Sequence, residues 1–230
     1  MQKNLAYIIL IVTYKNDKLM KKEFQEICNI YKNRYVSIFR QLYPTSKKSG
    51  FTERNLSVNF AVAYENYSCQ MKQNTVTWYE FQFGKKNNEH FDAIIINFST
   101  REILIIESKR YNNMSKQLKA VNKDIGRIKL FPSIDLSRIP KLEQYKLYGV
   151  ILADIWTSQT TSVKLKKAII EQYRKKVFVE KNKKVFTNCT DKDVFEYNVQ
   201  NFRDCNTVLQ EALICSDYYL LSMFWEINNA

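Results

Sequence analysis

Two short apolar runs separated by a polar stretch stand out in the pattern of hydrophobic and polar positions. Ala93 to Phe98 and Ile103 to Ile106 are rich in isoleucine, and residues 99–102 between them are polar. Apolar runs of this length, bounded by turn residues, are typical of buried strands, and so short a connection favours an antiparallel pair. The pattern therefore predicts a buried β-hairpin.

The register of this hairpin decides which charged residues meet at its open end. If residues 99–100 form a two-residue loop, Phe98 pairs with Arg101. Counting back along the ladder then sets Asp92 directly opposite Glu107, and directly opposed residues share a face with Cβ atoms roughly 5 Å apart. The register therefore predicts two carboxylates side by side.

A lysine joins these carboxylates, because side chains in a strand alternate with a period of two and Lys109 falls on the face of Glu107. Two close carboxylates repel each other unless a cation lies between them, and their hard oxygen atoms favour Mg²⁺ or Mn²⁺. The lysine could orient a water or stabilise charge that develops on a phosphoryl group. The alternative is an ordinary hairpin whose solvated ends carry charges.

The rest of the pattern predicts helices and strands on both sides of the hairpin. Apolar residues recur at helical spacing in three segments, and two further apolar or alternating runs predict strands. The predicted helices run from Lys18 to Leu42, from the candidate N-cap Thr52 through Tyr67, and from Met114 to Leu130; the predicted strands run from Trp78 to Phe83 and from Leu147 to Ile155.

From Asp191 onward the apolar spacing is again typical of a helix. The apolar residues of this part are predicted to form core or a dimer interface: Val208, Leu209, Leu213, Tyr219, Leu220 and Phe224. Asp154, near the end of the preceding predicted strand, is interpreted as structural.

The hairpin carries a motif as well as a pattern. Asp92, followed after the turn by Glu107-Ser108-Lys109, resembles the signature of the PD-(D/E)XK nuclease superfamily, which includes restriction endonucleases, repair nucleases and Holliday-junction resolvases. Phe91 stands where the signature has proline. The resemblance covers the residues from Thr52 to Arg127. It implies an α/β fold with a restriction-endonuclease-like core, in which helices flank a mixed central sheet.

The resemblance also implies roles for particular side chains. Asp92 and Glu107 would hold Mg²⁺, or Mn²⁺, and Lys109 would position the attacking water or stabilise the transition-state oxyanion. A glutamate from the helix ahead of the hairpin often joins such a site, and Glu53 is the candidate; its alternative role is to complement the helix dipole. Two other acids are weaker candidates for this place: Glu65 and Glu80.

The charge of the chain favours a polyanionic partner. Lysine and arginine number 36 against 23 acidic residues, which gives a net charge of +13. Residues 163–186 hold nine basic and two acidic residues with aromatic residues between them, a composition that suits the phosphate backbone of nucleic acid. The alternative is a solvated lysine face. The candidate contacts are Lys164, Lys166, Lys167, Arg174, Lys175 and Lys176.

Composition narrows the remaining possibilities. Five cysteines without a C-x-x-C pair, together with a single histidine, argue against zinc and for a reducing, cytoplasmic location. The apolar run from Leu5 to Thr13 is too short to span a bilayer. The net charge would also suit an anionic membrane, but the sequence contains no convincing basic amphipathic membrane helix, so nucleic acid is favoured and no membrane association is expected. With 4 glycines and 3 prolines there is little room for a linker, which predicts one nuclease domain over residues 1–230, with a core at about 52–156 and a basic part, 157–230, packed on it.

These observations predict a Mg²⁺-dependent endonuclease that hydrolyses phosphodiester bonds in DNA and serves restriction, repair or defence. The resemblance implies a homodimer, since two sites are needed to cut both strands. Two alternatives stay open: a catalytically inactive nucleic-acid-binding module on the same scaffold, and a nuclease that acts on RNA.

Overall fold

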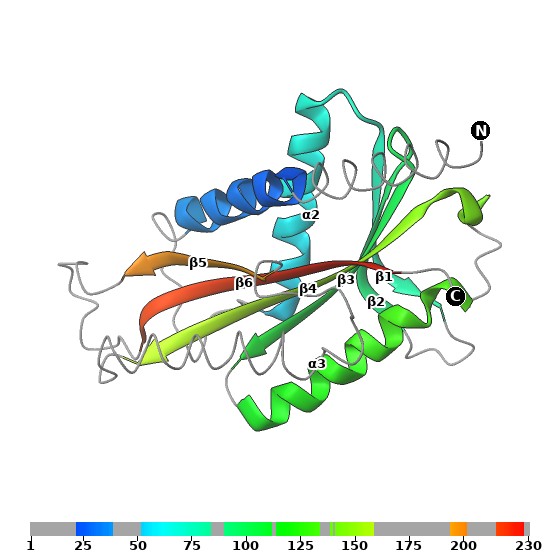
Figure 1. Ribbon diagram of the computed structural model, residues 1–230. Helices are drawn as coiled ribbons and strands as arrows, with labels where there is room; N and C mark the ends of the chain where they lie inside the picture. The colour runs from blue at the N-terminus through cyan, green and yellow to red at the C-terminus, as the bar shows by residue number, and fades with distance from the viewer. Residues whose placement is uncertain are drawn as a thin grey trace, which may run out of the picture.

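The computed structural model describes eight parts of the chain (Figure 1): residues 22–38, 52–83, 90–111, 114–133, 139, 141–158, 194–201 and 215–227. Residues 22–38 are helical. The other helices are α2 (Glu53–Gln70) and α3 (Met114–Lys129), with the 3-10 turns η1 (Phe131–Ser133) and η2 (Leu142–Gln144). The strands are β1 (Thr75–Gln82), β2 (His90–Asn97), β3 (Glu102–Tyr111), β4 (Lys146–Ser158), β5 (Val194–Asn201) and β6 (Cys215–Ile227).

The strands form a six-stranded mixed sheet in the order β1-β2-β3-β4-β6-β5. Strands β1, β2 and β3 are antiparallel neighbours, α3 crosses from β3 to the parallel strand β4, and β6 returns antiparallel between β4 and β5. The architecture is thus α/β. The predicted succession of helix, three strands, helix and strand is confirmed over residues 53–158.

Two hydrophobic cores sandwich the sheet. On one face α2 and the helical residues 22–38 pack through Phe60 and Tyr31 against side chains such as Ile95. On the other face α3 packs through Val121 and Ile125 against the alternate positions of the same strands. Figure 1 shows the helices on opposite sides of the sheet. Burial on both faces explains why the hairpin strands are continuously apolar instead of alternating.

The predicted register of the β2–β3 hairpin is confirmed. Ala93 pairs with Ile106 and Asn97 pairs with Glu102, which is the register that follows from the two-residue loop. One further step of this register sets Asp92 across from Glu107. The ladder ends before that step, at Ala93 and Ile106, so the predicted direct pairing of Asp92 with Glu107 lies just beyond the paired residues.

The turn itself is longer than predicted. Four residues after Asn97 lie outside the ladder, so the expected pair of Phe98 with Arg101 is wrong. The Oδ1 atom of Asn97 accepts hydrogen bonds of 3.0 and 3.1 Å from the backbone N–H groups of Ser99 and Thr100. Asparagine favours such a turn over another rung of the ladder, because its side chain takes the place of a backbone acceptor.

The helical interpretation of the C-terminal region is wrong where the structure describes it. Residues 194–201 and 215–227 are strands, and Leu220 lies in the core opposite Asp154 of β4. Tyrosine, phenylalanine, tryptophan and isoleucine are enriched in β6 and favour a strand once β4 offers a partner edge. Three residues of the predicted apolar set lie outside the described residues: Val208, Leu209 and Leu213.

The apolar run from Leu5 to Thr13 also lies outside the described residues. Among the helices that the structure describes, none combines the length and the apolar character needed to cross a membrane.

Candidate active site

The two strands of the hairpin stop pairing with each other at its open end. The ladder between β2 and β3 ends at Ala93 and Ile106, although β2 continues back to His90 and β3 continues to Tyr111. Beyond the ladder, backbone groups of β3 that face β2 need other acceptors. We call this opening the fork.

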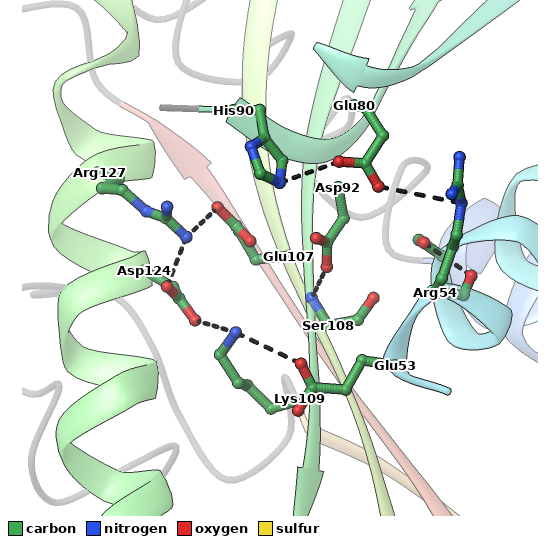
Figure 2. A network of polar contacts seen from close by, with 11 residues as sticks. Glu53, Arg54, Glu80, His90, Asp92, Glu107, Ser108, Lys109, Asp124 and Arg127 are labelled. Atoms are coloured by element: carbon green, nitrogen blue, oxygen red, sulfur yellow. Dashed lines mark hydrogen bonds and ion pairs between the residues drawn. The ribbon is translucent and has the colours of Figure 1, made fainter. Parts of the chain in front are cut away.

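Carboxylates supply those acceptors. The backbone N–H of Ser108 donates to Asp92 Oδ2 at 2.7 Å, and that of Arg110 donates to Glu53 Oε1 at 3.0 Å. Glu53 reaches the fork from the first turn of α2, as the resemblance implied. Asp92 and Glu53 are therefore fixed by the main chain of β3, the strand that carries Glu107 and Lys109. Figure 2 shows the contact of Asp92 with Ser108.

Glu107 lies at the centre of the fork and is almost inaccessible, with 1% of its surface exposed. Burial and the nearby carboxylates of Asp92 and Asp124 raise the pKa of Glu107 to about 9, against the opposing effect of Arg127 and Lys109. Burial also raises the pKa of Asp92 above its usual value, although the Ser108 N–H and Lys109 lower it. Both carboxylates are thus held where their charge is poorly compensated.

Helix α3 adds two residues that the sequence interpretation missed, Asp124 and Arg127. Arg127 Nη2 lies 2.6 Å from Glu107 Oε1 and 2.6 Å from Asp124 Oδ1. A signal for Asp124 was available: it sits inside the apolar stripe of Val121, Ile125 and Ile128, where a carboxylate requires a partner. Arg127 follows at i+3, on the same side of the helix.

Lys109 connects the two sides of the fork. Its Nζ atom lies 3.0 Å from Asp124 Oδ2 on α3 and 3.9 Å from Glu53 Oε2 on α2. Burial lowers the pKa of Lys109, but Asp124, Glu53 and Glu107 together outweigh it and raise that pKa above its ordinary value. Lys109 therefore stays protonated at neutral pH and serves as a fixed positive charge.

The side chains that meet at the fork, which we call the fork cluster, comprise four carboxylates and two cations: Glu53, Asp92, Glu107, Asp124, Lys109 and Arg127. If all six were ionised, two negative charges would remain uncompensated. This deficit equals the charge of one divalent cation. The raised pKa of Glu107 shows the alternative, in which a proton supplies part of the missing charge.

The carboxylate oxygens of the fork suit Mg²⁺ bound through only two protein ligands. Within the described ranges, no three His, Cys, Asp or Glu side chains converge closely enough to form a ready-made metal site. Mg²⁺ does not need one, because it keeps several waters and is commonly bound through one or two carboxylates and a substrate phosphate. Asp92 Oδ1 and Glu107 Oε2 accept no hydrogen bond from the described part of the chain, so each offers an oxygen.

Glu80 and Glu65, the two weaker candidates for an additional carboxylate of the site, lie in different places. Glu80 lies at the rim of the fork, where its carboxylate pairs with His90 Nε2 at 2.9 Å and with Arg54 Nε at 3.9 Å. Its backbone is left-handed, with φ of 51°, a conformation that costs a non-glycine residue about 1–2 kcal/mol. Glu65 instead accepts a 2.6 Å hydrogen bond from the hydroxyl of Thr77. Of the two, only Glu80 contributes to the electrostatics of Asp92.

Asp154, interpreted from the sequence as structural, has an ion-pair partner in the neighbouring strand β3. It is buried, and Arg110 Nε lies 3.3 Å from its Oδ2 atom. The six basic residues predicted to contact nucleic acid lie outside the described residues: Lys164, Lys166, Lys167, Arg174, Lys175 and Lys176.

The fork therefore brings together Asp92, Glu107, Lys109 and Glu53, the four predicted site residues, and adds Asp124 and Arg127. No family model matches this chain, and no curated protein or solved structure shows significant similarity to it.

Proposed function

We propose that this protein is a divalent-metal-dependent nuclease that hydrolyses phosphodiester bonds in DNA on a restriction-endonuclease-like core. The observation that carries the proposal is the fork. There Asp92 and Glu107 both have raised pKa values, Asp92 is close enough to raise that of Glu107, and Lys109 is held at the same place as a protonated amine. The fork cluster, which would keep two uncompensated negative charges if all its members were ionised, can bind a divalent metal, and its fixed cation can contact a phosphate bound beside that metal.

The order of elements supports the same proposal. A helix, three antiparallel strands, a crossover helix and a parallel strand follow each other as in the superfamily that the Asp92 and Glu107-Ser108-Lys109 motif resembles. Asp92 lies near the start of the second strand, and Glu107-Ser108-Lys109 lies near the end of the third, where the ladder opens. The match of motif, register and topology is more specific than the motif alone.

The side chains of the fork have separate roles in this proposal. A bound Mg²⁺ supplies Lewis-acid activation of a water molecule and charge neutralisation at the phosphate. Asp92 and Glu107 provide its protein ligands. Lys109 stabilises the negative charge that develops on the phosphoryl oxygens, because it is protonated and anchored by Asp124 at 3.0 Å. Glu53 fixes the end of β3 through Arg110 and limits the fork on the α2 side.

The substrate assignment rests on charge. A net charge of +13 draws in polyanions, and residues 163–186 concentrate it. Cleavage of both strands of a duplex would use two copies of the site, so we include a homodimer in the proposal.

A second candidate function has an observation of its own. Arg127 and Lys109 already form ion pairs with Glu107 and Asp124, and cations of the protein could replace a metal permanently. The chain would then be a binding module that retains the scaffold without catalysis.

Incubation of the protein with supercoiled plasmid, single-stranded DNA and RNA, in Mg²⁺, in Mn²⁺ and in EDTA, separates these functions. The proposal predicts nicking or linearisation of DNA that requires the cation. Metal-dependent cleavage of RNA alone would make the protein a ribonuclease. Retarded DNA bands without product in any cation would favour the binding module.

A further inference from the structure

Arg127 is held at the fork by an unusual use of its guanidinium group. A single nitrogen, Nη2, contacts both Glu107 Oε1 and Asp124 Oδ1 at 2.6 Å, and Figure 2 shows the group lying between the two carboxylates. Its Nε is buried, yet it donates no hydrogen bond within the described part of the chain. A guanidinium group is planar and has five N–H donors, so much of the hydrogen-bonding capacity of Arg127 is unused.

The contact with Glu107 conflicts with the proposed metal. A divalent cation bound to Asp92 and Glu107 would lie close to the positive charge of Arg127, and like charges at that separation repel each other. Arg127 also uses one of the two Glu107 oxygens. In the metal-free protein Arg127 is therefore bound to Glu107, and it competes with a divalent cation for that carboxylate.

Asp124 is placed to retain Arg127 at the fork if a cation displaces it from Glu107. It lies three residues before Arg127 on α3, and its second oxygen contacts Lys109 Nζ at 3.0 Å. Both cations of the fork cluster therefore share one anchor. A guanidinium released from Glu107 but still bound to Asp124 would present its remaining donors to the opening, where they match the oxygens of a phosphate group.

We propose that Arg127 is a phosphate-binding residue that exchanges Glu107 for a substrate phosphate when a divalent cation occupies the Asp92–Glu107 pair. Asp124 is the positioning residue that holds Arg127 through the exchange. This inference rests on the proposed nuclease function, because it uses the same metal and the same phosphate.

The exchange makes two predictions with opposite signs. Arg127→Met removes the competitor, so Mn²⁺ binding to the protein alone becomes tighter, by about fivefold to tenfold for the loss of one partly buried neighbouring charge. The same substitution removes a phosphate contact, so DNA affinity in the presence of a cation falls about tenfold. A merely structural role of Arg127 would weaken both.

Mn²⁺ affinity is measured by calorimetry without nucleic acid, on wild type, Arg127→Met, Arg127→Lys and Lys129→Met. Lys129 is an exposed residue of the same helix and controls for the loss of one positive charge. We expect tighter binding in Arg127→Met alone, and near wild-type affinity in Arg127→Lys, which retains the competing charge. Unchanged or weaker binding in a folded Arg127→Met, or no Mn²⁺ binding in any variant, overturns the exchange.

DNA affinity is measured by fluorescence anisotropy with a labelled 20-base-pair duplex, in Ca²⁺ and in EDTA. We expect Arg127→Met to match wild type in EDTA, where Arg127 is bound to Glu107, and to bind about tenfold more weakly in Ca²⁺. Equal affinities in Ca²⁺ overturn the phosphate contact. Thermal unfolding confirms that each variant is folded. If Arg127→Met does not fold, Arg127→Lys is used for the DNA measurement, because lysine cannot make the bidentate contact of a guanidinium group.

Neither measurement reads cleavage, so the two proposals can fail separately. If no nucleic acid is cut but both affinities change as expected, the exchange stands and the nuclease proposal fails. If DNA is cut and Arg127→Met leaves both affinities unchanged, only the exchange is wrong.

Discussion

The carboxylate of Asp92 accepts a 2.7 Å hydrogen bond from the backbone N–H of Ser108, the residue that follows Glu107 on β3. This contact stands where the next rung of the hairpin ladder would be, because the backbone pairing of β2 and β3 has ended at Ala93 and Ile106. One oxygen of Asp92 is thereby fixed by the main chain, and the other remains available at the open end. The fold itself aims this carboxylate at the fork.

The Ser108 contact predicts different stabilities for two substitutions of Asp92. Asp92→Ala leaves the Ser108 N–H without its acceptor, and we expect the free energy of unfolding to fall by about 1–3 kcal/mol. Asp92→Asn retains an acceptor and removes a charge from a crowded site, so we expect a change of less than about 1 kcal/mol. Urea unfolding in metal-free buffer measures both, and equal losses in the two variants would show that the contact does not fix the fork.

The raised pKa of Glu107 predicts that the metal-free protein is less stable at alkaline pH. The ordinary pKa is 4.5 and the folded value is about 9, so between these values the folded state binds more protons than the unfolded state. Stability therefore falls as pH rises through this window. We expect a loss of about 1–3 kcal/mol between pH 6 and pH 8 that Glu107→Gln abolishes, measured by urea unfolding.

Glu143→Gln is the control for that experiment, since Glu143 is an exposed acid on η2. The control should keep the pH dependence of the wild type. Mg²⁺ should restore stability at pH 8 in wild type and not in Glu107→Gln. A wild-type protein whose stability is flat between pH 6 and pH 8 would contradict the assignment of Glu107 as an undercompensated carboxylate.

Lys109 is predicted to act as a positive charge and not as a base, because neighbouring carboxylates raise its pKa above 10.5. We expect Lys109→Met to lower single-turnover cleavage by about 10²- to 10³-fold, with Mn²⁺ binding retained, and Lys109→Arg to keep part of the activity. The wild-type pH–rate profile from pH 7 to pH 10 should show no rise that depends on Lys109. A rise present in wild type and absent from Lys109→Arg would assign a proton-transfer role instead.

Two glycines test the packing that supports the site. A Cβ on Gly149 of β4 would lie 2.1 Å from the Trp225 ring of β6, whereas a Cβ on Gly126 of α3 meets nothing within 4 Å. We expect Gly149→Ala to destabilise the protein by about 1–3 kcal/mol through overpacking. Gly126→Ala should stabilise it by about 0.4–1 kcal/mol, because alanine is the better helix former. Similar unfolding midpoints for the two variants would argue against the β4–β6 pairing.

Much of the fork could be predicted because its determinants are local in the chain. The register of the β2–β3 hairpin follows from two apolar runs and a short turn, and its continuation one step past the ladder leads to Asp92 and Glu107. Glu53 was harder, since its approach to Arg110 spans 57 residues, and only the resemblance indicated it. The turn was predicted one residue too short on each side, because Asn97 forms a side-chain turn.

The incorrect sequence predictions share a different cause, because tertiary contacts determine the structure of these segments. Residues 215–227 have apolar positions that also fit a helix, but the free edge of β4 makes them a strand. In the sequence, Asp124 and Arg127 look like ordinary charged residues of a basic helix. Only the packing of α3 over the end of β3 brings them to Glu107. Charges within an apolar helical stripe are the signal that sequence reasoning could have used.

The most direct test of the account is the rate of metal-dependent plasmid cleavage by Asp92→Asn compared with Glu102→Gln. Glu102 begins the same strand that carries Glu107, at the end away from the fork, and its side chain accepts a 2.6 Å hydrogen bond from Thr100. If the fork is the active site, Asp92→Asn loses cleavage by about 10²-fold or more in Mg²⁺ and Mn²⁺ while staying folded, and Glu102→Gln cuts like wild type. Equal cleavage by both variants, or wild-type cleavage that persists in EDTA, would contradict the account.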